Sequence, residues 1–127
     1  MISQPQRTIV PIYTSRGDAE AFLCYPYLYS RLGEWIGWVA SDRKVYSVIG
    51  IYVGELTGDP RIVRKRITAS LRPRLTPPPR PGRITVPATI PLAPLMGDLR
   101  FGTMDVLLEE PERLHTLDAG ELKEDMA

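Results

Sequence analysis

The sequence predicts a small all-β domain of short antiparallel hairpins, radial or barrel-like, followed by an extended proline-rich linker and short C-terminal helical segments. Nine of the ten aromatic residues lie between Tyr13 and Tyr52, and eight of the thirteen prolines lie between Pro73 and Pro94. A third observation, an internal repeat with regularly spaced glycines, identifies the first half as the folded part. We therefore expect three parts, which are a β-repeat domain over residues 8–66, a linker over 67–97 and an acidic segment over 98–127.

The internal repeat organises the first half of the chain. Residues 12–23, 28–39 and 45–56 align on a tyrosine, on a glycine four residues later and on an apolar ending. The aligned residues are Tyr13, Tyr29 and Tyr46 for the tyrosine and Gly17, Gly33 and Gly50 for the glycine. A period of 16 to 17 residues is too short for a helical repeat and fits two short strands joined by a turn. The residues around the tyrosine favour strands, and the glycine permits the positive φ of a tight turn.

A fourth copy begins at Arg61 but lacks the tyrosine and the glycine, so we expect an incomplete unit that forms an outer or closing strand. A second glycine position, Gly37 and Gly54, recurs in the second and third copies, where the first copy has Ala21. A glycine within a strand often marks the close approach of another part of the chain. We therefore expect these two glycines to face a crowded centre.

These features resemble the bacterial proteins with a four-fold β-flower domain. The resemblance rests on the three Tyr-x-x-x-Gly pairs, on residues 33–37 and 52–54, and on the basic closing segment 61–66, and it covers about half of the chain. It implies a β-flower of four short hairpins and no particular biochemical activity. A barrel of the PRC type, which also combines short strands with recurrent glycines, is the alternative fold.

Residues 70–94 are expected to be extended. Their prolines remove amide donors and restrict the preceding residues, which excludes a helix or a central strand and favours polyproline II. We interpret this segment as a semi-rigid spacer. The alternative is that residues 77–81, Pro-Pro-Pro-Arg-Pro, are a ligand for the aromatic groove of another protein.

The C-terminal segment contains two candidate helices, residues 103–110 and 118–126, and Pro111 ends the first. Both are too short to be stable alone in water, so each needs a partner surface. Either the segment docks on its own β-domain or it orders on a protein partner, and we expect the second. The expected partner-binding residues are the apolar ones of the first helix, Met104, Val106, Leu107 and Leu108.

The formal net charge of +1 combines unlike segments. Residues 61–83 hold eight basic side chains and no acidic one, whereas residues 84–127 hold three basic and nine acidic ones. A basic stretch of this density attracts anions, including nucleic acids. The residues expected to contact an anion or a nucleic acid are Arg61, Arg64, Lys65, Arg66, Arg72 and Arg74. We expect the tryptophans and tyrosines to fill the small core rather than to stack on bases.

Several kinds of chemistry lack the residues they need. One cysteine, Cys24, and one histidine, His115, cannot assemble a structural zinc site, and no phosphate-binding glycine loop is present. We therefore expect no metal, no cofactor and no catalytic activity. No secretory signal and no apolar run of about 20 residues is visible, so we expect a cytoplasmic protein without a membrane span.

These observations predict a non-enzymatic scaffold, adaptor or accessory subunit. In this hypothesis the β-domain tethers or assembles, through self-association or within a larger complex, and the C-terminal segment binds a protein partner. The alternative hypothesis is a nucleic-acid-associated accessory protein that uses residues 61–83.

Overall fold

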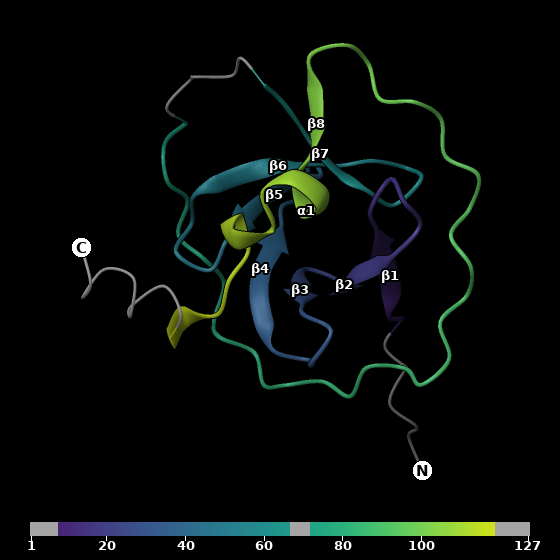
Figure 1. Cartoon of the computed structure of the whole chain (residues 1–127). Helices are drawn as coiled ribbons and strands as arrows, with labels where there is room; N and C mark the ends of the chain where they lie inside the picture. The colour runs from purple at the N-terminus through teal and green to yellow at the C-terminus, as the bar shows by residue number, and fades with distance from the viewer. Residues whose placement is uncertain (1–7, 67–71, 119–127) are drawn as a thin grey trace.

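The structure is a computed structural model that describes residues 8–66 and 72–118. These residues form one curled antiparallel sheet in which the eight strands follow one another in chain order (Figure 1). The strands are β1 (Val10–Tyr13), β2 (Ala19–Cys24), β3 (Tyr27–Tyr29), β4 (Trp35–Val39), β5 (Lys44–Ser47), β6 (Tyr52–Leu56), β7 (Ile62–Lys65) and β8 (Thr103–Asp105). A short helix, α1 (Val106–Glu109), and a 3-10 turn (Pro111–Arg113) follow β8. The predicted all-β class is confirmed.

The three predicted repeats are three hairpins, β1–β2, β3–β4 and β5–β6, that share the same local details. In each hairpin the pairing register shifts immediately before the repeated tyrosine, which marks a β-bulge. The residue after the tyrosine carries a hydroxyl group that accepts a hydrogen bond from a backbone amide within the turn or directly after it, and the glycine that ends the turn has a positive φ. The hydroxyl residues are Thr14, Ser30 and Ser47. The repeat is therefore a bulge followed by a hydroxyl-stabilised turn.

The fourth hairpin is completed by the C-terminal segment. β7 pairs with β8, although residues 66–102 separate the two strands. The amide of Arg66 donates a hydrogen bond of 2.7 Å to the carbonyl oxygen of Gly102, which has a positive φ like the turn glycines of the other hairpins. The expected boundaries at residues 66 and 97 are wrong in this respect, because residues 103–109 contribute β8 and α1 to the β-domain.

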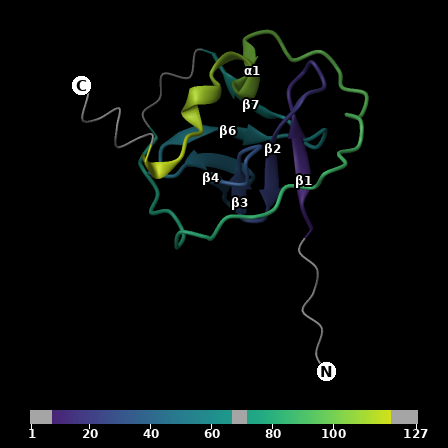
Figure 2. The same cartoon turned by 60° about the horizontal axis from the view of Figure 1, so that its bottom comes forward.

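Residues 72–97, which we call the proline-rich belt, contain no helix or strand, as their prolines predict. The belt runs around the outside of the sheet and follows the outline of the molecule in two views (Figures 1 and 2). It contacts the turn glycines of the other three hairpins in reverse order, at Leu75, Ile84 and Ala93. The hydroxyl groups of Tyr27 and Tyr13 donate hydrogen bonds of 2.6 Å to the carbonyl oxygens of Pro79 and Pro91. The interpretation as a spacer is therefore wrong, because the belt is held along its length by its own domain.

The proline run at residues 77–81 lies within this belt. Pro77, Pro78 and Pro81 are half-buried, and Pro79 accepts the hydrogen bond from Tyr27. This run is thus packed on its own domain, which argues against the alternative of a ligand that is free for the groove of another protein.

Two apolar clusters stabilise the domain. The first is aliphatic, fills the inside of the curled sheet and includes Val106 and Leu107 of α1 together with Leu114. A Cβ atom on Gly37 would lie 2.7 Å from Leu114 Cδ2, and one on Gly54 would lie 2.6 Å from the carbonyl oxygen of Val63. The expectation that both glycines face a crowded centre is confirmed, because the space that a side chain would need is already filled.

The second cluster is aromatic and gathers Trp35, Trp38, Tyr29 and Tyr46 with Cys24 and Val48. Its tryptophans and tyrosines are at most 8% exposed. Ile84 of the belt and Leu117 pack against this cluster, so the belt helps to cover it. The expectation that the aromatic residues fill the core is confirmed for these four residues, which are not available to stack on bases.

Candidate functional site

An open groove of about 960 Å³ lies over β6 and β7. Its lining comes from these two strands, from the turn between them, from Lys44 of β5 and from Arg72 at the start of the belt. Just beyond the belt, it also comes from Asp98, Leu99, Arg100 and Thr103. We call it the β6–β7 groove. Its basic lining residues are Lys44, Arg61, Arg64, Lys65, Arg72 and Arg100, and its acidic ones are Glu55, Asp59 and Asp98. Six positive and three negative charges leave a net charge of +3.

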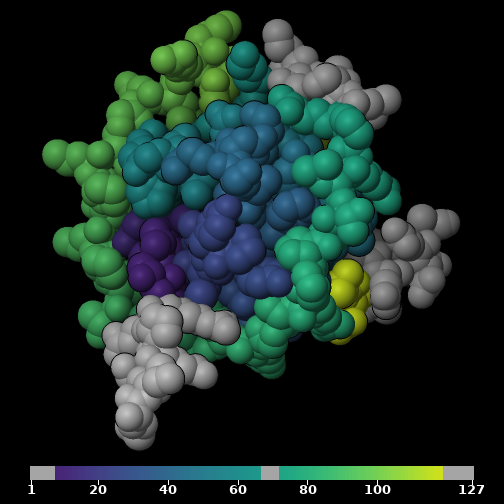
Figure 3. Space-filling model, turned by 180° about the vertical axis from the view of Figure 1, so that it is seen from behind, coloured from purple at the N-terminus to yellow at the C-terminus, as the bar shows by residue number. Residues whose placement is uncertain are grey.

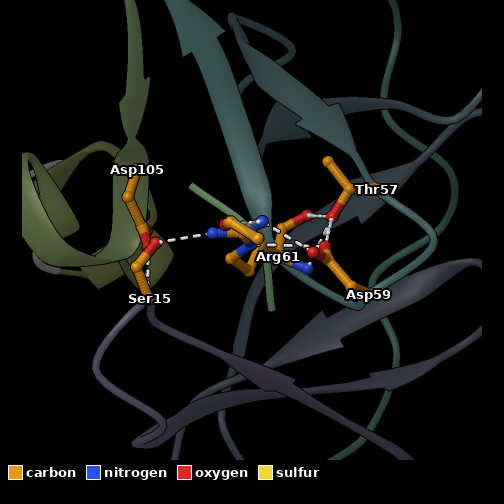
Figure 4. A network of polar contacts seen from close by, with 6 residues as sticks. Ser15, Thr57, Asp59, Arg61 and Asp105 are labelled. Carbon is orange, nitrogen blue, oxygen red and sulfur yellow. Dashed lines mark hydrogen bonds and ion pairs between the residues drawn. The ribbon is translucent and has the colours of Figure 1, made fainter. Parts of the chain in front are cut away.

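Arg61 is the centre of a polar network beside the groove (Figure 4). It is 5% exposed, and its guanidinium group donates to both carboxylate oxygens of Asp59 at 3.2 and 2.6 Å. It also donates to Ser15 Oγ at 2.9 Å and to the carbonyl oxygen of Gly97 at 3.1 Å. The hydrogen bond from Arg61 lowers the pKa of Asp59, so this carboxyl group is a stable anion.

The network continues from Ser15 to Asp105. The amide and the hydroxyl group of Ser15 donate to the same oxygen of Asp105, at 2.6 and 2.7 Å, while the other oxygen accepts from the amide of Leu108 at 3.3 Å. Asp105 is 1% exposed and is the N-cap of α1. Figure 4 shows how the network joins the β1–β2 turn, the β6–β7 turn and the β8–α1 junction. The beginning and the end of the sheet are therefore held together beside the groove.

Lys44 and Arg72, which also line the groove, make a second set of contacts. Lys44 Nζ lies 2.9 Å from Glu55 Oε1, and this hydrogen bond raises the pKa of Lys44. The guanidinium carbon of Arg72 lies 4.3 Å from the centre of the Tyr52 ring, which is a cation–π contact. Tyr52 in turn contacts Tyr46 edge to face, with ring centres 5.9 Å apart. The aromatic cluster thus supports the side chain of Arg72 at the groove.

Two of the basic residues are neutralised by the acidic residues of the C-terminal segment. Arg64 forms an ion pair with Glu110, and Arg66 forms one with Glu109 at 2.8 Å. Lys65, Arg72 and Arg100 make no ion pair with any other residue in the described ranges 8–66 and 72–118. These three cations are therefore the ones that can attract an anionic ligand.

The structure brings together four of the six residues expected to contact an anion. Arg61, Arg64, Lys65 and Arg72 line the groove, whereas Arg66 and Arg74 do not. Arg61 is corrected from a contact residue to a structural one, because its donors are used within the protein. Sequence reasoning missed Lys44 and Arg100. Both lie outside the basic stretch 61–83, Lys44 directly after Arg43 and Arg100 two residues after Asp98, so local charge density does not assign them to the same site.

The four residues expected to bind a partner lie elsewhere. Met104, Val106 and Leu107 are 5%, 0% and 7% exposed, and Leu108 is half-buried. Val106 and Leu107 belong to the aliphatic cluster, so the alternative in which this segment docks on its own β-domain is the one the structure shows. The expectation of free apolar anchors is corrected accordingly. The second expected helix, over 118–126, falls almost wholly on residues outside those described.

The described residues contain no group of three or more histidine, cysteine, aspartate or glutamate side chains arranged to hold a metal ion. Cys24 is buried in the aromatic cluster, and His115 Nδ1 lies 2.8 Å from the carbonyl oxygen of Thr116. Neither residue lines the β6–β7 groove. Within 8–66 and 72–118, no helix is long and apolar enough to cross a membrane.

Four hairpins in one curled sheet, a belt around them and a cationic groove define the class of this protein as a small β-repeat domain. The chain belongs to the 4-fold beta flower protein family, whose match covers residues 10–96. The match includes the first three hairpins, β7 and nearly all of the belt, and it ends before β8. Comparison with curated proteins and with solved structures returned no match.

Proposed function

We propose that this protein is a non-enzymatic binding module, an adaptor or accessory subunit, that holds an acidic segment of a protein partner in the β6–β7 groove. The observation that carries the proposal is the set of three cations, Lys65, Arg72 and Arg100, around an open groove in which they have no ion-pair partner among the described residues. The Arg61 network holds one side of the groove in place before a ligand arrives, which reduces the entropy that binding costs.

The ionisable groups of the groove support binding rather than catalysis. General acid or base catalysis near neutral pH is favoured by a carboxyl pKa that is raised or a lysine pKa that is lowered. Here the pKa of Asp59 is lowered by Arg61, and the pKa of Lys44 is raised by Glu55. Both groups thus keep their charge, which suits a fixed electrostatic surface.

The acidic lining residues favour a protein segment over a nucleic acid. Glu55, Asp59 and Asp98 share the groove with the cations. A nucleic acid strand repeats a negative charge at every nucleotide and would place some of these charges near the three carboxylates. A protein segment can instead present acidic residues to the cations and polar residues to the carboxylates.

A second candidate function is nucleic-acid binding, and the contact between Arg72 and Tyr52 favours it. An arginine supported by an aromatic ring at the edge of a cationic groove can stack on an unpaired base. Arg74, two residues along the belt, is exposed and can contact phosphate. This candidate predicts single-stranded ligands and a strong dependence of the affinity on salt.

Fluorescence anisotropy with two labelled probes, an oligoglutamate peptide and an oligothymidine strand, tests the two candidates. The groove variant is Lys65→Glu, Arg72→Glu and Arg100→Glu. The control variant, Arg16→Glu, Arg31→Glu and Arg80→Glu, changes the net charge equally at exposed positions outside the groove. Peptide binding that the groove variant loses and the control variant keeps supports the proposal.

Two outcomes contradict the proposal. Equal loss of peptide binding in both variants assigns the binding to overall charge rather than to the groove. Binding of oligothymidine without binding of the peptide at the same salt concentration assigns the groove to nucleic acid.

A further inference from the structure

The later part of the belt has a composition unlike the rest of the chain. Residues 84–97 contain no charged side chain, although 24% of the residues in the protein are charged. Most of this stretch is exposed, and Figure 3 shows the later part of the belt, in light green, projecting from the left rim of the molecule. Moving an uncharged segment out of water costs less free energy than moving a charged one, because no ionised group has to be desolvated.

Three large apolar side chains on and just beyond this stretch are almost completely exposed. Leu92, Leu95 and Phe101 are 94%, 102% and 106% exposed. A single exposed leucine is ordinary on a protein surface, but three such side chains within ten residues mark an interaction site. Side chains this exposed contribute little to the packing of their own domain, so the stability of the fold does not explain their apolar character.

From these observations we infer that residues 90–97 and Phe101 dock on an anionic lipid surface, with Leu92, Leu95 and Phe101 inserted among the lipid chains. The three side chains lie three and six residues apart along a segment without helix or strand, and each is almost fully exposed, so each is available to enter a soft surface. A lipid surface adapts to separate protrusions, and its affinity grows with the apolar area that is buried.

The backbone of this segment suits the membrane interface. Pro91 and Pro94 have no amide hydrogen, which reduces the number of donors that would lose water. The carbonyl oxygen of Pro91 already accepts a hydrogen bond from the Tyr13 hydroxyl group, and Ala93 contacts the turn at Gly17. The belt is thus anchored to the domain at the point where it presents the two leucines.

The basic side chains near Phe101 favour lipids with acidic headgroups. Phe101 follows Arg100, which lines the β6–β7 groove together with Lys65 and Arg72. These cations have no ion-pair partner among the described residues, and basic side chains beside an apolar anchor attract acidic headgroups. The inference does not rest on the binding of an acidic peptide, because insertion uses apolar side chains that lie outside the groove lining.

Co-sedimentation of the full chain with vesicles tests the inference. The vesicles contain phosphatidylcholine alone or phosphatidylcholine mixed with phosphatidylglycerol. The apolar variant is Leu92→Ser, Leu95→Ser and Phe101→Ser, and the control is Tyr25→Ser with Leu32→Ser, which removes exposed apolar side chains elsewhere. We expect the wild type and the control to bind the mixed vesicles at low salt and the apolar variant to bind at least about tenfold less. Circular dichroism checks that each variant is folded.

Three results would overturn the inference. The first is no sedimentation of the wild type with mixed vesicles at low salt, and the second is equal sedimentation of the apolar variant. The third is a loss confined to Lys65→Glu, Arg72→Glu and Arg100→Glu, which would assign the binding to charge without insertion. If the first result is obtained, a protein partner that binds the wild type and not the apolar variant would assign these side chains to protein contact instead.

Discussion

The amide of Ile84 donates a hydrogen bond of 3.1 Å to the carbonyl oxygen of Gly33, and a methyl group on Gly33 would overlap the carbonyl oxygen of Ile84. The same two contacts join Leu75 to Gly50. The two belt residues are nine positions apart (84 − 75), and the two glycines are 17 apart (50 − 33). Nine residues of the belt thus span one repeat of the sheet. Each of these turn glycines both allows the tight turn and leaves room for the belt.

Replacement of Gly33 by alanine should loosen the belt. The backbone φ of +78° costs a residue with a side chain about 1–2 kcal/mol, and the overlap with Ile84 adds to this cost. We expect a lower free energy of unfolding in urea and faster tryptic cleavage after Arg80 and Arg83. Gly58→Ala is the control, because a Cβ atom there meets no atom within 4 Å. Equal stability and equal cleavage of the two variants would show that the belt is not held at Gly33.

Replacement of Arg61 by methionine should destabilise the fold more than the loss of an exposed arginine. The variant leaves Asp59 without its cationic partner and removes the bonds to Ser15 and Gly97, which should cost about 3 kcal/mol or more. In the control, Arg31→Met, the side chain is 69% exposed and lies 4.0 Å from Glu20, so the expected change is below about 1 kcal/mol. Urea unfolding measures both, and similar values would remove Arg61 from the structural role.

The stability that Asp59 contributes should depend on pH. Because Arg61 lowers the pKa of Asp59 in the folded state, the contribution is complete above the unfolded pKa of about 3.9 and is lost as the pH falls through the lower folded value. The difference in free energy of unfolding between the wild type and Asp59→Asn should therefore shrink from about pH 6 to about pH 3. The other carboxyl groups are present in both proteins, so their contributions cancel in this difference. A difference that stays constant with pH would contradict the ion pair.

Truncation of Leu107 should destabilise the fold, whereas truncation of Leu92 should not. Leu107 is 7% exposed in the aliphatic cluster, so Leu107→Ala should lower the free energy of unfolding by about 2–4 kcal/mol. Leu92 is 94% exposed, and Leu92→Ala should change it by no more than about 0.5 kcal/mol. Urea unfolding compares the two variants. An unchanged stability of Leu107→Ala would return Leu107 to the partner-binding hypothesis.

Much of the site depends on contacts that the sequence separates. The cluster of basic residues in 61–83 pointed to Lys65 and Arg72, because charge density is visible locally. Lys44 reaches the same groove only because β5 pairs with β6, with Lys44 opposite Glu55. Arg100 reaches it only because the chain returns after the belt and pairs with β7 through β8. Equally, Arg61 looks like its basic neighbours in the sequence, and only burial beside Asp59 distinguishes it.

Three properties could be predicted from the order of the amino acids alone: the all-β class, the three hairpins with their turn glycines and the absence of regular structure in the belt. These properties follow from local causes, namely side-chain type, the positive φ of glycine and the missing amide of proline. Three other properties are seen only in the folded chain. β8 completes the fourth hairpin, the belt packs on the turns at Gly33 and Gly50, and Val106 and Leu107 fill the centre of the sheet. These contacts join residues that lie far apart in the chain. Which residues meet depends on shape and burial in the folded domain, and a local sequence pattern does not predict it.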